Sequence, residues 1–499
     1  MSEYEVPEPI LNSAFASPSR YWYIRRGHEP AMREGRRPSV VYPPDNTRVP
    51  WELGDVLRLS TDFAPAFEMT LVNRIRERLA QWRRQNYTGA SRVTLELLQW
   101  WRREGRQQPL FYAQIEAVET IIFLNEGRGD LLQGVNVPSD EPTEQQLAAG
   151  AKAFMRYACK MATGSGKTTV MGMLAAWSIL NKVNDANNAK YSDVVLIVCP
   201  NVTIKNRLAE LEPKRGDASL YRTRDLVPAH LMPDLMRGRV LVMNWHIFAL
   251  HDPNQDGLSA RVRRNGVEKD APKTIQIGAK NTTARGKRYL TEEELQRQIG
   301  AGLVEVLTET RDGQEVGGKK NLMVFNDEAH HAYRIRQRIE DEKEVEEEED
   351  DDTKYEEEEA TVWMEGLDRI HKMRGINFCL DLSATPYYLA RVGRDTNKPF
   401  PWVVSDFPLS DAIESGLVKI PQWAVRDNTG AEVPGFRNIW KWVLEKMTPR
   451  ERGGKRAQAK PEAVLKYAHT PIASVNWQQK TPSGGDGVNE RAMGVEPWQ

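Results

Sequence analysis

Three short polar motifs in this chain carry residue types that bind phosphate or activate water. The first motif consists of Gly164, Ser165, Gly166, Lys167, Thr168 and Thr169. Its glycines let backbone amides turn toward phosphate oxygens, and the helix expected after the loop adds a partial positive charge. In such a loop the lysine reaches the β- and γ-phosphates of a nucleotide, and the next hydroxyl ligates Mg²⁺. We therefore expect Lys167 to hold the phosphates of ATP and Thr168 to hold the metal.

The second motif is an acidic pair that follows the apolar run 322–325. Asp327 is of the right type to hold Mg²⁺, and Glu328 to orient and deprotonate an attacking water. A lone pair of this kind is more often an ordinary acidic turn, but its combination with a phosphate loop favours the catalytic interpretation. His330 and His331 lack the spacing of a zinc site.

Two further groups could complete such a site. Ser383 and Thr385 follow the apolar run 376–382, where their hydroxyls suit a hydrogen-bonding hinge, with a simple turn as the alternative. The Gln114 amide could pair with the edge of an adenine while Phe111 stacks on the ring. The alternative for Gln114 is a solvated position on an amphipathic helix.

Apolar runs are expected to position these motifs. They lie at 154–160, 194–199, 240–243, 322–325 and 376–382, and residues 171–180 form an apolar helical stretch. Strands that are apolar throughout and alternate with helices predict a parallel sheet covered by helices on both faces, which is an α/β fold. Ligands of such sheets bind at the carboxyl ends of the strands, where the motifs after these runs fall.

The pattern differs outside this region. Residues 1–63 are predicted as an extended basic arm, whose aromatic residues at 21–23 either stack on bases or dock on the chain's own domain. A helical region is predicted over 64–108 from the spacing of Phe67, Leu71, Ile75, Leu79 and Trp82. Its solvated face is predicted to carry Arg83, Arg84, Arg102 and Arg103.

The sheet domain is predicted over 109–400, with polar inserts at 251–320 and 336–360. Residues 401–463 are predicted as a connector. Residues 464–499 are predicted as the truncated start of a second domain or as a disordered tail.

Charge is unevenly distributed. Fifteen acidic and two basic residues lie between 340 and 359, so this run carries −13 while the rest of the chain, whose total is −1, carries +12. Like charges at that density are expected to stay solvated or to form a single charged helix. The basic remainder fits a polyanionic partner, although such a surplus is also ordinary in 499 residues.

The cysteines and the apolar runs indicate the cellular compartment. Three cysteines without CxxC spacing argue against a zinc site or a disulfide framework and for a reducing compartment. Cys199 and Cys379 lie in apolar runs and are predicted as buried thiols. No apolar run approaches the length of a membrane span, and the first residues lack the apolar segment of a signal peptide. We expect a cytoplasmic protein without a membrane partner.

The ordered motifs resemble those of superfamily 2 helicases and translocases. Residues 160–168 (KMATGSGKT) are similar to the phosphate loop of type III restriction enzyme Res subunits, including the methionine at its first position. Residues 326–331 (NDEAHH), 381–387 (DLSATPY) and 407–418 (FPLSDAIESGLV) fit the same DEAH-box group. The resemblance covers residues 109–425.

The resemblance implies a RecA-like P-loop NTPase domain that binds ATP and Mg²⁺. It implies catalytic roles for Lys167, Asp327 and Glu328, with Thr168 and Asp327 as metal ligands. It implies that the nucleotide is bound by Gly164, Ser165, Gly166, Lys167, Thr168, Thr169, Gln114 and Phe111. It also implies coupling residues His330, Ser383 and Thr385, and nucleic-acid contacts at Pro200, Asn201 and Asn244.

Motors of this type need a second RecA-like domain, whose arginine neutralises charge on the γ-phosphate. No such unit is recognised after residue 425, and no nuclease motif stands in a suitable context. The chain is therefore predicted as the N-terminal half of a DNA helicase or translocase subunit from a restriction-modification-like system, weakly active alone. The expected partners are DNA, with RNA as the alternative, and either a modification or specificity subunit or a second RecA-like half. The competing interpretations are a DEAH-type RNA helicase fragment and a non-catalytic fragment that binds nucleic acid or a partner.

Overall fold

The computed structural model describes residues 8–24, 29–41, 67–148, 150–248, 320–334, 351–388 and 398–419, together with Val6 and isolated residues between 443 and 467. The chain divides into two compact units, 1–44 with 64–419, and 45–63 with 420–499. The described residues of the second unit include a small apolar cluster with Val443, Met447 and Ala463. The predicted insert 251–320 except for its last residue, residues 336–350 of the predicted insert 336–360 and most of the predicted tail lie outside the described residues.

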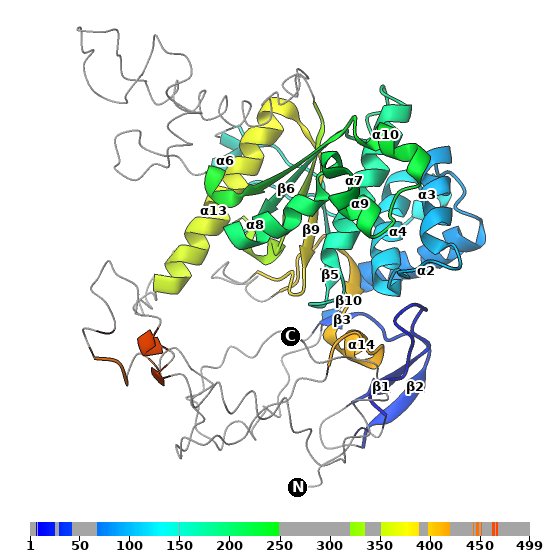
Figure 1. Ribbon diagram of the computed structural model, residues 1–499, viewed down its shortest axis with the longest axis horizontal. Coiled ribbons are helices and arrows are strands. Elements are labelled where there is room, and N and C mark those ends of the chain that lie inside the picture. Colours follow the sequence, from blue (N-terminus) through cyan, green and yellow to red (C-terminus); the bar gives the residue numbers. More distant parts are fainter. Residues whose placement is uncertain are drawn as a thin grey trace. The chain divides into compact units, whose positions relative to one another are not determined.

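A six-stranded parallel sheet forms the centre of the first unit (Figure 1). Its strands are β5 (Arg156–Met161), β6 (Val194–Cys199), β7 (Arg239–Asn244), β8 (Leu322–Asp327), β9 (Ile376–Ser383) and β10 (Val403–Phe407). Their order in the sheet is β10-β5-β9-β8-β6-β7, and every neighbouring pair is parallel. The predicted α/β fold with a parallel sheet is thus confirmed.

Helices cover both faces of this sheet. On one face lie α2 (Thr70–Arg84), α3 (Arg92–Arg102), α4 (Tyr112–Glu126) and α7 (Lys167–Asn184), and on the other lies α13 (Asp351–Arg374) (Figure 1). Side chains alternate along each strand, so Val195 and Ile197 of β6 join the core under α7, whereas Leu196 joins the core under α13. Both faces of each strand must therefore be apolar, which explains the continuous runs in the sequence.

The remaining elements are short. They are β1 (Arg20–Tyr23), β2 (Ala31–Glu34), β3 (Val40–Val41), β4 (Phe67–Glu68), α5 (Gly129–Leu132), α6 (Glu144–Ala148), α8 (Val202–Leu208), α9 (Leu220–Thr223), α10 (Met232–Leu235) and α14 (Leu409–Glu414), with single turns of 3-10 helix at 209–211, 213–218, 229–231, 245–248 and 329–331. None of the helices in the described residues is long and apolar enough to cross a membrane.

The helical region predicted over 64–108 is not a separate layer. Phe67 belongs to the short strand β4, and the helix begins only at Thr70. Trp82 of α2 and Trp101 of α3 are buried in the same core as α7. These helices bury large apolar faces against α7, so the predicted boundary at residue 108 does not divide the structure.

The predicted solvated arginine face is also corrected. Arg83 and Arg102 both form ion pairs with Glu119, whose side chain is buried within α4. A carboxylate at that depth requires charged partners because desolvation otherwise disfavours its ionised form. The two arginines therefore tie α2 and α3 to α4.

Two predicted boundaries in the second half of the domain are wrong for similar reasons. Residues 403–407 lie in the predicted connector but form β10, the edge strand beside β5. The predicted acidic insert 336–360 includes the start of α13, which continues to Arg374 and buries Trp363 and Leu367 against the sheet. The acidic composition of the first residues of α13 hid the apolar residues that follow in the same helix. Of the two predicted alternatives for residues 351–360, the charged helix is the one observed.

The three cysteines, Cys159, Cys199 and Cys379, are buried free thiols on β5, β6 and β9. Burial raises the pKa of each thiol. The prediction of buried core thiols at Cys199 and Cys379 is confirmed.

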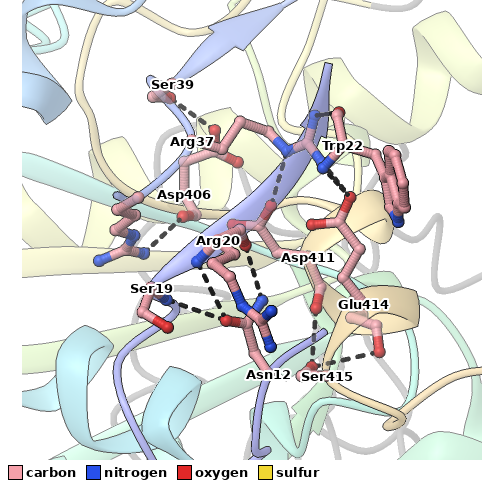
Figure 2. Close-up of polar contacts among 12 residues, drawn as sticks. Asn12, Ser19, Arg20, Trp22, Arg37, Ser39, Asp406, Asp411, Glu414 and Ser415 are labelled. Atoms are coloured by element: carbon pink, nitrogen blue, oxygen red, sulfur yellow. Dashed lines mark hydrogen bonds and ion pairs between the residues drawn. The ribbon is translucent and has the colours of Figure 1, made fainter. Parts of the chain in front are cut away.

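The N-terminal arm docks on the sheet domain rather than projecting from it. Arg37 Nε donates to Asp411 Oδ1 at 2.9 Å, and Arg37 also pairs with Glu414 of α14 (Figure 2). Tyr21 and Trp22 are buried, and the Trp22 amide donates to Glu414 Oε1 at 3.1 Å. The arm's aromatic residues at 21 and 22 thus serve docking, the second of the two predicted alternatives.

One fully buried arginine pairs with carboxylates from two other segments of the chain. Arg156 of β5 donates to Asp381 Oδ2 at 2.9 Å and to Asp140 Oδ2 at 3.0 Å, and its side chain is 0% exposed. Removing one partner from such a cluster leaves uncompensated buried charge, which costs about 3–5 kcal/mol.

We predict that Arg156→Met lowers the free energy of unfolding by about 3–5 kcal/mol in urea titrations, because the buried Asp381 loses its charged partner and keeps only the neutral donors Asn326 and Trp402. The matched control is Arg128→Met, which removes the exposed ion pair to Asp130, with side chains 56% and 59% exposed. That change is expected to cost less than about 1 kcal/mol. Equal effects of the two substitutions would contradict the structural role of Arg156.

A second prediction concerns Glu116 of α4. Burial alone would raise the pKa of Glu116, but the paired Arg36 guanidinium, helped by Arg76 and Arg83, lowers it to about 2 from the ordinary 4.5. A depressed carboxyl pKa stabilises the folded state above pH 4.5, and this contribution is lost as the pH falls toward 2. The shift corresponds to about 3 kcal/mol.

The unfolding free energies of the wild type and of Glu116→Gln should therefore converge as the pH falls from about 5 to about 2. Asp130→Asn, which alters an exposed carboxylate, should keep a constant difference from the wild type over that range. Urea unfolding at several pH values measures both. A difference for Glu116→Gln that does not change with pH would argue against this pairing.

Candidate functional site

The predicted site residues gather at one edge of the sheet. Because all six strands are parallel, their carboxyl ends lie at the same edge, and β5, β9 and β8 are consecutive there. The loop 162–166 leaves β5, Asp327 ends β8, and Ser383 ends β9. Motifs separated by more than 200 residues in the chain thus meet at one place.

The loop after β5 turns at two glycines. Gly164 and Gly166 have φ angles of 85° and 89°, in the left-handed region that favours glycine, and Gly166 caps the N-terminus of α7. Ser165 is buried, and its hydroxyl donates to the Ala162 carbonyl at 2.6 Å. Ser165 therefore fixes the loop, while the glycines leave backbone amides able to turn toward a ligand.

Lys167 and Glu328 form an ion pair that joins the first and second motifs. The Lys167 side chain is 13% exposed and that of Glu328 is 30% exposed. Glu328 adopts φ and ψ of 49° each, a left-handed conformation that is uncommon for residues other than glycine. Such strain is found most often at functional sites, where surrounding contacts hold it.

Asp327 lies beside this pair and is almost fully enclosed. Burial raises the pKa of Asp327 to about 6, and the Glu328 carboxylate adds to the rise while Lys167 opposes it. Its Oδ1 atom is buried without a hydrogen-bond partner among the described residues. An unpaired buried carboxylate oxygen at a strand end suits a cation ligand.

The predicted coupling residues meet at the ends of β8 and β9. His330 Nδ1 lies 2.9 Å from Ser383 Oγ, and Ser383 Oγ also accepts from the Thr385 amide at 3.0 Å. Burial, together with the charge of His331, lowers the pKa of His330 to about 4. The Thr385 side chain is exposed, and only its backbone joins this chain of contacts.

Gln114 reaches the phosphate loop. Its side chain is buried, its Oε1 accepts from the Phe111 amide at 3.0 Å, and its Nε2 would lie 2.0 Å from a Cβ built at Gly166. The solvated alternative for Gln114 is therefore wrong. Thr168 and Thr169 lie in the first turn of α7, with Thr169 buried.

The three predicted nucleic-acid contacts lie at the carboxyl ends of β6 and β7. Asn201 is the N-cap of α8 and accepts from the Ile204 amide at 2.9 Å. Asn244 Nδ2 donates to the Pro200 carbonyl at 3.0 Å, and Asn244 Oδ1 accepts from the His246 amide. These residues are adjacent at the sheet edge, but each asparagine already serves a local turn.

Val418 beside the loop and Phe15 beside Phe111 are not among the predicted site residues. Val418 Cγ2 would lie 3.7 Å from a Cβ built at Gly164, and the Phe15 ring centroid lies 5.6 Å from that of Phe111. Val418 stands at the end of the segment 407–418, which resembles a family motif but carries no predicted role. For Phe15 no signal exists in the sequence, because it precedes Phe111 by 96 residues.

Comparison with family models, curated proteins and solved structures finds no match for this chain. Among the described residues, no group of three or more histidine, cysteine, aspartate or glutamate side chains is arranged to hold a metal. A metal at Asp327 would thus need hydroxyl, water or ligand oxygens to complete its shell.

We predict that Gly166→Ala destabilises the protein more than Gly164→Ala. Both substitutions place a side chain at positive φ, which costs about 1 kcal/mol. Only at Gly166 would the new Cβ collide with Gln114, whose displacement breaks its bond to the Phe111 amide.

The loss of unfolding free energy caused by each glycine substitution is measured by thermal or urea unfolding, in the wild-type background and in a Gln114→Ala background. In a Gln114→Ala background, the cost of Gly166→Ala should fall to that of Gly164→Ala, since only the backbone strain remains. An unchanged cost in that background would show that Gln114 does not pack on the loop.

Proposed function

We propose that this chain binds ATP with Mg²⁺ and hydrolyses it as the RecA-like motor domain of a superfamily 2 helicase or translocase. The observation that carries the proposal is the meeting of Lys167 with Glu328 and Asp327 across β9. A lysine that follows a glycine-rich loop, a buried carboxylate oxygen without a hydrogen-bond partner among the described residues and a glutamate with positive φ converge at the carboxyl edge of a parallel sheet. No purely structural role requires all three at one edge.

Each residue has a distinct task in this proposal. Lys167 leaves its ion pair with Glu328 to bind the terminal phosphates, which frees the Glu328 carboxylate to orient and deprotonate water. Asp327 and the Thr168 hydroxyl would hold Mg²⁺, and the unpaired Oδ1 of Asp327 fits that role. Bound Mg²⁺ supplies charge neutralisation to the phosphates.

The link from the ATP site to movement is proposed to pass through His330 and Ser383. Their contact joins the ends of β8 and β9, directly beside Glu328. A change in the position of Glu328 would therefore displace His330 and Ser383, and with them the segment that begins with Thr385. We propose DNA as the partner, and a second RecA-like half, which would supply an arginine to the γ-phosphate, as the source of full activity.

The proposal predicts opposite effects of two substitutions. Lys167→Ala should weaken ATP binding about tenfold or more, because a charge-assisted phosphate contact is lost. Glu328→Gln should retain ATP binding and lower turnover about 10²-fold or more, because it removes the general base. Calorimetric titration and phosphate release measure the two effects.

Lys182→Ala is the matched control, since Lys182 lies on α7 and donates to the Asn188 carbonyl. It should leave both quantities unchanged. Wild-type turnover by Glu328→Gln would exclude the proposed base.

The partner is tested by ATPase stimulation with duplex DNA and with single-stranded RNA. We expect duplex DNA to stimulate and basal turnover to stay low. Stimulation by RNA alone would favour the DEAH-type RNA helicase, and nucleic-acid binding that survives Lys167→Ala without any ATPase activity would favour a non-catalytic binding fragment.

A further inference from the structure

The last residue of the acidic run contacts the second motif. Glu359 ends the acidic residues between 340 and 359, yet its side chain is only 4% exposed. It lies on α13, and its Oε2 atom is 3.2 Å from Nδ1 of His331. His331 closes the 3-10 turn that follows Glu328. A carboxylate that its composition would place in solvent is therefore buried beside the proposed catalytic glutamate.

This contact continues to the carboxylate of Glu328. The ring centroids of His331 and His330 are 4.3 Å apart, and His330 Nδ1 lies 3.5 Å from Glu328 Oε2. The backbone follows the same route, because the His331 amide donates to the Glu328 carbonyl at 3.1 Å. Two histidine side chains and one turn of backbone thus connect α13 to Glu328.

A second polar contact of α13 reaches the other end of the acidic pair. The Trp363 indole N–H donates to Asn326 Oδ1 at 3.1 Å, and both side chains are fully buried. Asn326 immediately precedes Asp327, and its Nδ2 donates to Asp381 Oδ1 of β9 at 2.8 Å. Both ends of the Asn326 amide are bonded, so its orientation is fixed. Helix α13 therefore contacts the chain on both sides of the acidic pair.

Packing alone does not account for these contacts. Leu367 and Ile370 already hold α13 on its face of the sheet through the apolar core (Figure 1). Burying the Glu359 carboxylate costs free energy, which an apolar side chain of similar size would avoid. Glu328, in contrast, needs support, because its φ of 49° is unfavourable for residues other than glycine and persists only where neighbours hold it.

We propose that α13 positions the acidic pair for catalysis. Glu359 is a positioning residue for Glu328, and Trp363 is a positioning residue for Asp327. The inference rests on the proposed function, because it requires Glu328 to act on water and Asp327 to hold Mg²⁺. Lys167 begins α7 on the opposite face of the sheet, so α13 governs the rate of turnover and not the affinity for ATP.

Two substitutions of similar size separate the polar contact of Glu359 from its packing. Glu359→Met removes the oxygen that faces His331 and should lower kcat about tenfold with an unchanged KM for ATP, since only the base is displaced. Glu359→Gln keeps an oxygen there and should retain most of the turnover. Phosphate release over a range of ATP concentrations, with duplex DNA present, measures both constants.

Glu365→Gln is the matched control. Glu365 is a carboxylate on the same helix, but its side chain is 53% exposed and pairs with Arg369. The substitution should change neither kcat nor KM.

Hydrogen exchange followed by mass spectrometry tests the positioning without any nucleotide. In Glu359→Met, peptides over 326–334 should exchange faster than in the wild type, because the His331 and Ala332 amide bonds of the turn, at 3.1 and 2.9 Å, open more often. Peptides over the phosphate loop 162–168 should keep their wild-type rates. Faster exchange along the whole chain would show a general loss of stability and would overturn the positioning role.

The contact of Trp363 is tested separately. Trp363→Phe keeps an aromatic ring but removes the donor to Asn326, so it should raise the Mg²⁺ concentration for half-maximal turnover about tenfold. The same segment, 326–334, should exchange faster. Trp100→Phe is the control, because it removes an indole donor to the Asp225 carbonyl, at a distance from the acidic pair in the chain. It should leave the Mg²⁺ dependence unchanged.

The results distinguish this inference from the proposed function. A Glu359→Met variant with wild-type kcat and wild-type exchange over 326–334 would overturn the positioning role and leave the proposed function standing. A wild-type chain that neither binds nor hydrolyses ATP would overturn the proposed function, and the positioning role with it.

Discussion

The structure depends on the burial of both faces of a parallel sheet. Each strand lies between α7 and its neighbours on one side and α13 on the other, so polar side chains are largely confined to the strand ends. Parallel order collects those ends at one edge. The meeting of Lys167, Asp327 and Glu328 is therefore a consequence of how the core is made, before any ligand is considered.

The main exceptions within this core are charged side chains held in ion pairs. Arg156 forms ion pairs with both Asp140 and Asp381. Glu116 and Glu119 of α4 are buried and form ion pairs with arginines. Such clusters contribute little net stability compared with apolar packing, but they tolerate few alternative arrangements. In this protein they link β5 to β9 and join the arm and the first helices to α4, so they define which segments assemble around the sheet.

The sequence predicted the sheet and its polar edge because both depend on local patterns. The runs before Pro200 and Asp327 are apolar at every position, and their ends match the observed strands within two residues. The role of Gln114 beside Gly166 could not be settled, since a glutamine on a helix looks the same whether buried or exposed. The position of the arm depends on ion pairs between residues more than 350 positions apart, such as Arg37 with Asp411, and β10 pairs with the distant strand β5, so no local pattern reveals either.

The three cysteines have a practical consequence for work on this protein. All of them are buried in the sheet with raised thiol pKa values, so the native chain offers little reactive thiolate at neutral pH. A single cysteine introduced at an exposed position, such as Ile24 on the arm, would then be the preferred target of a maleimide dye. The arm could be followed by fluorescence in the otherwise natural sequence, without first replacing residues of the core.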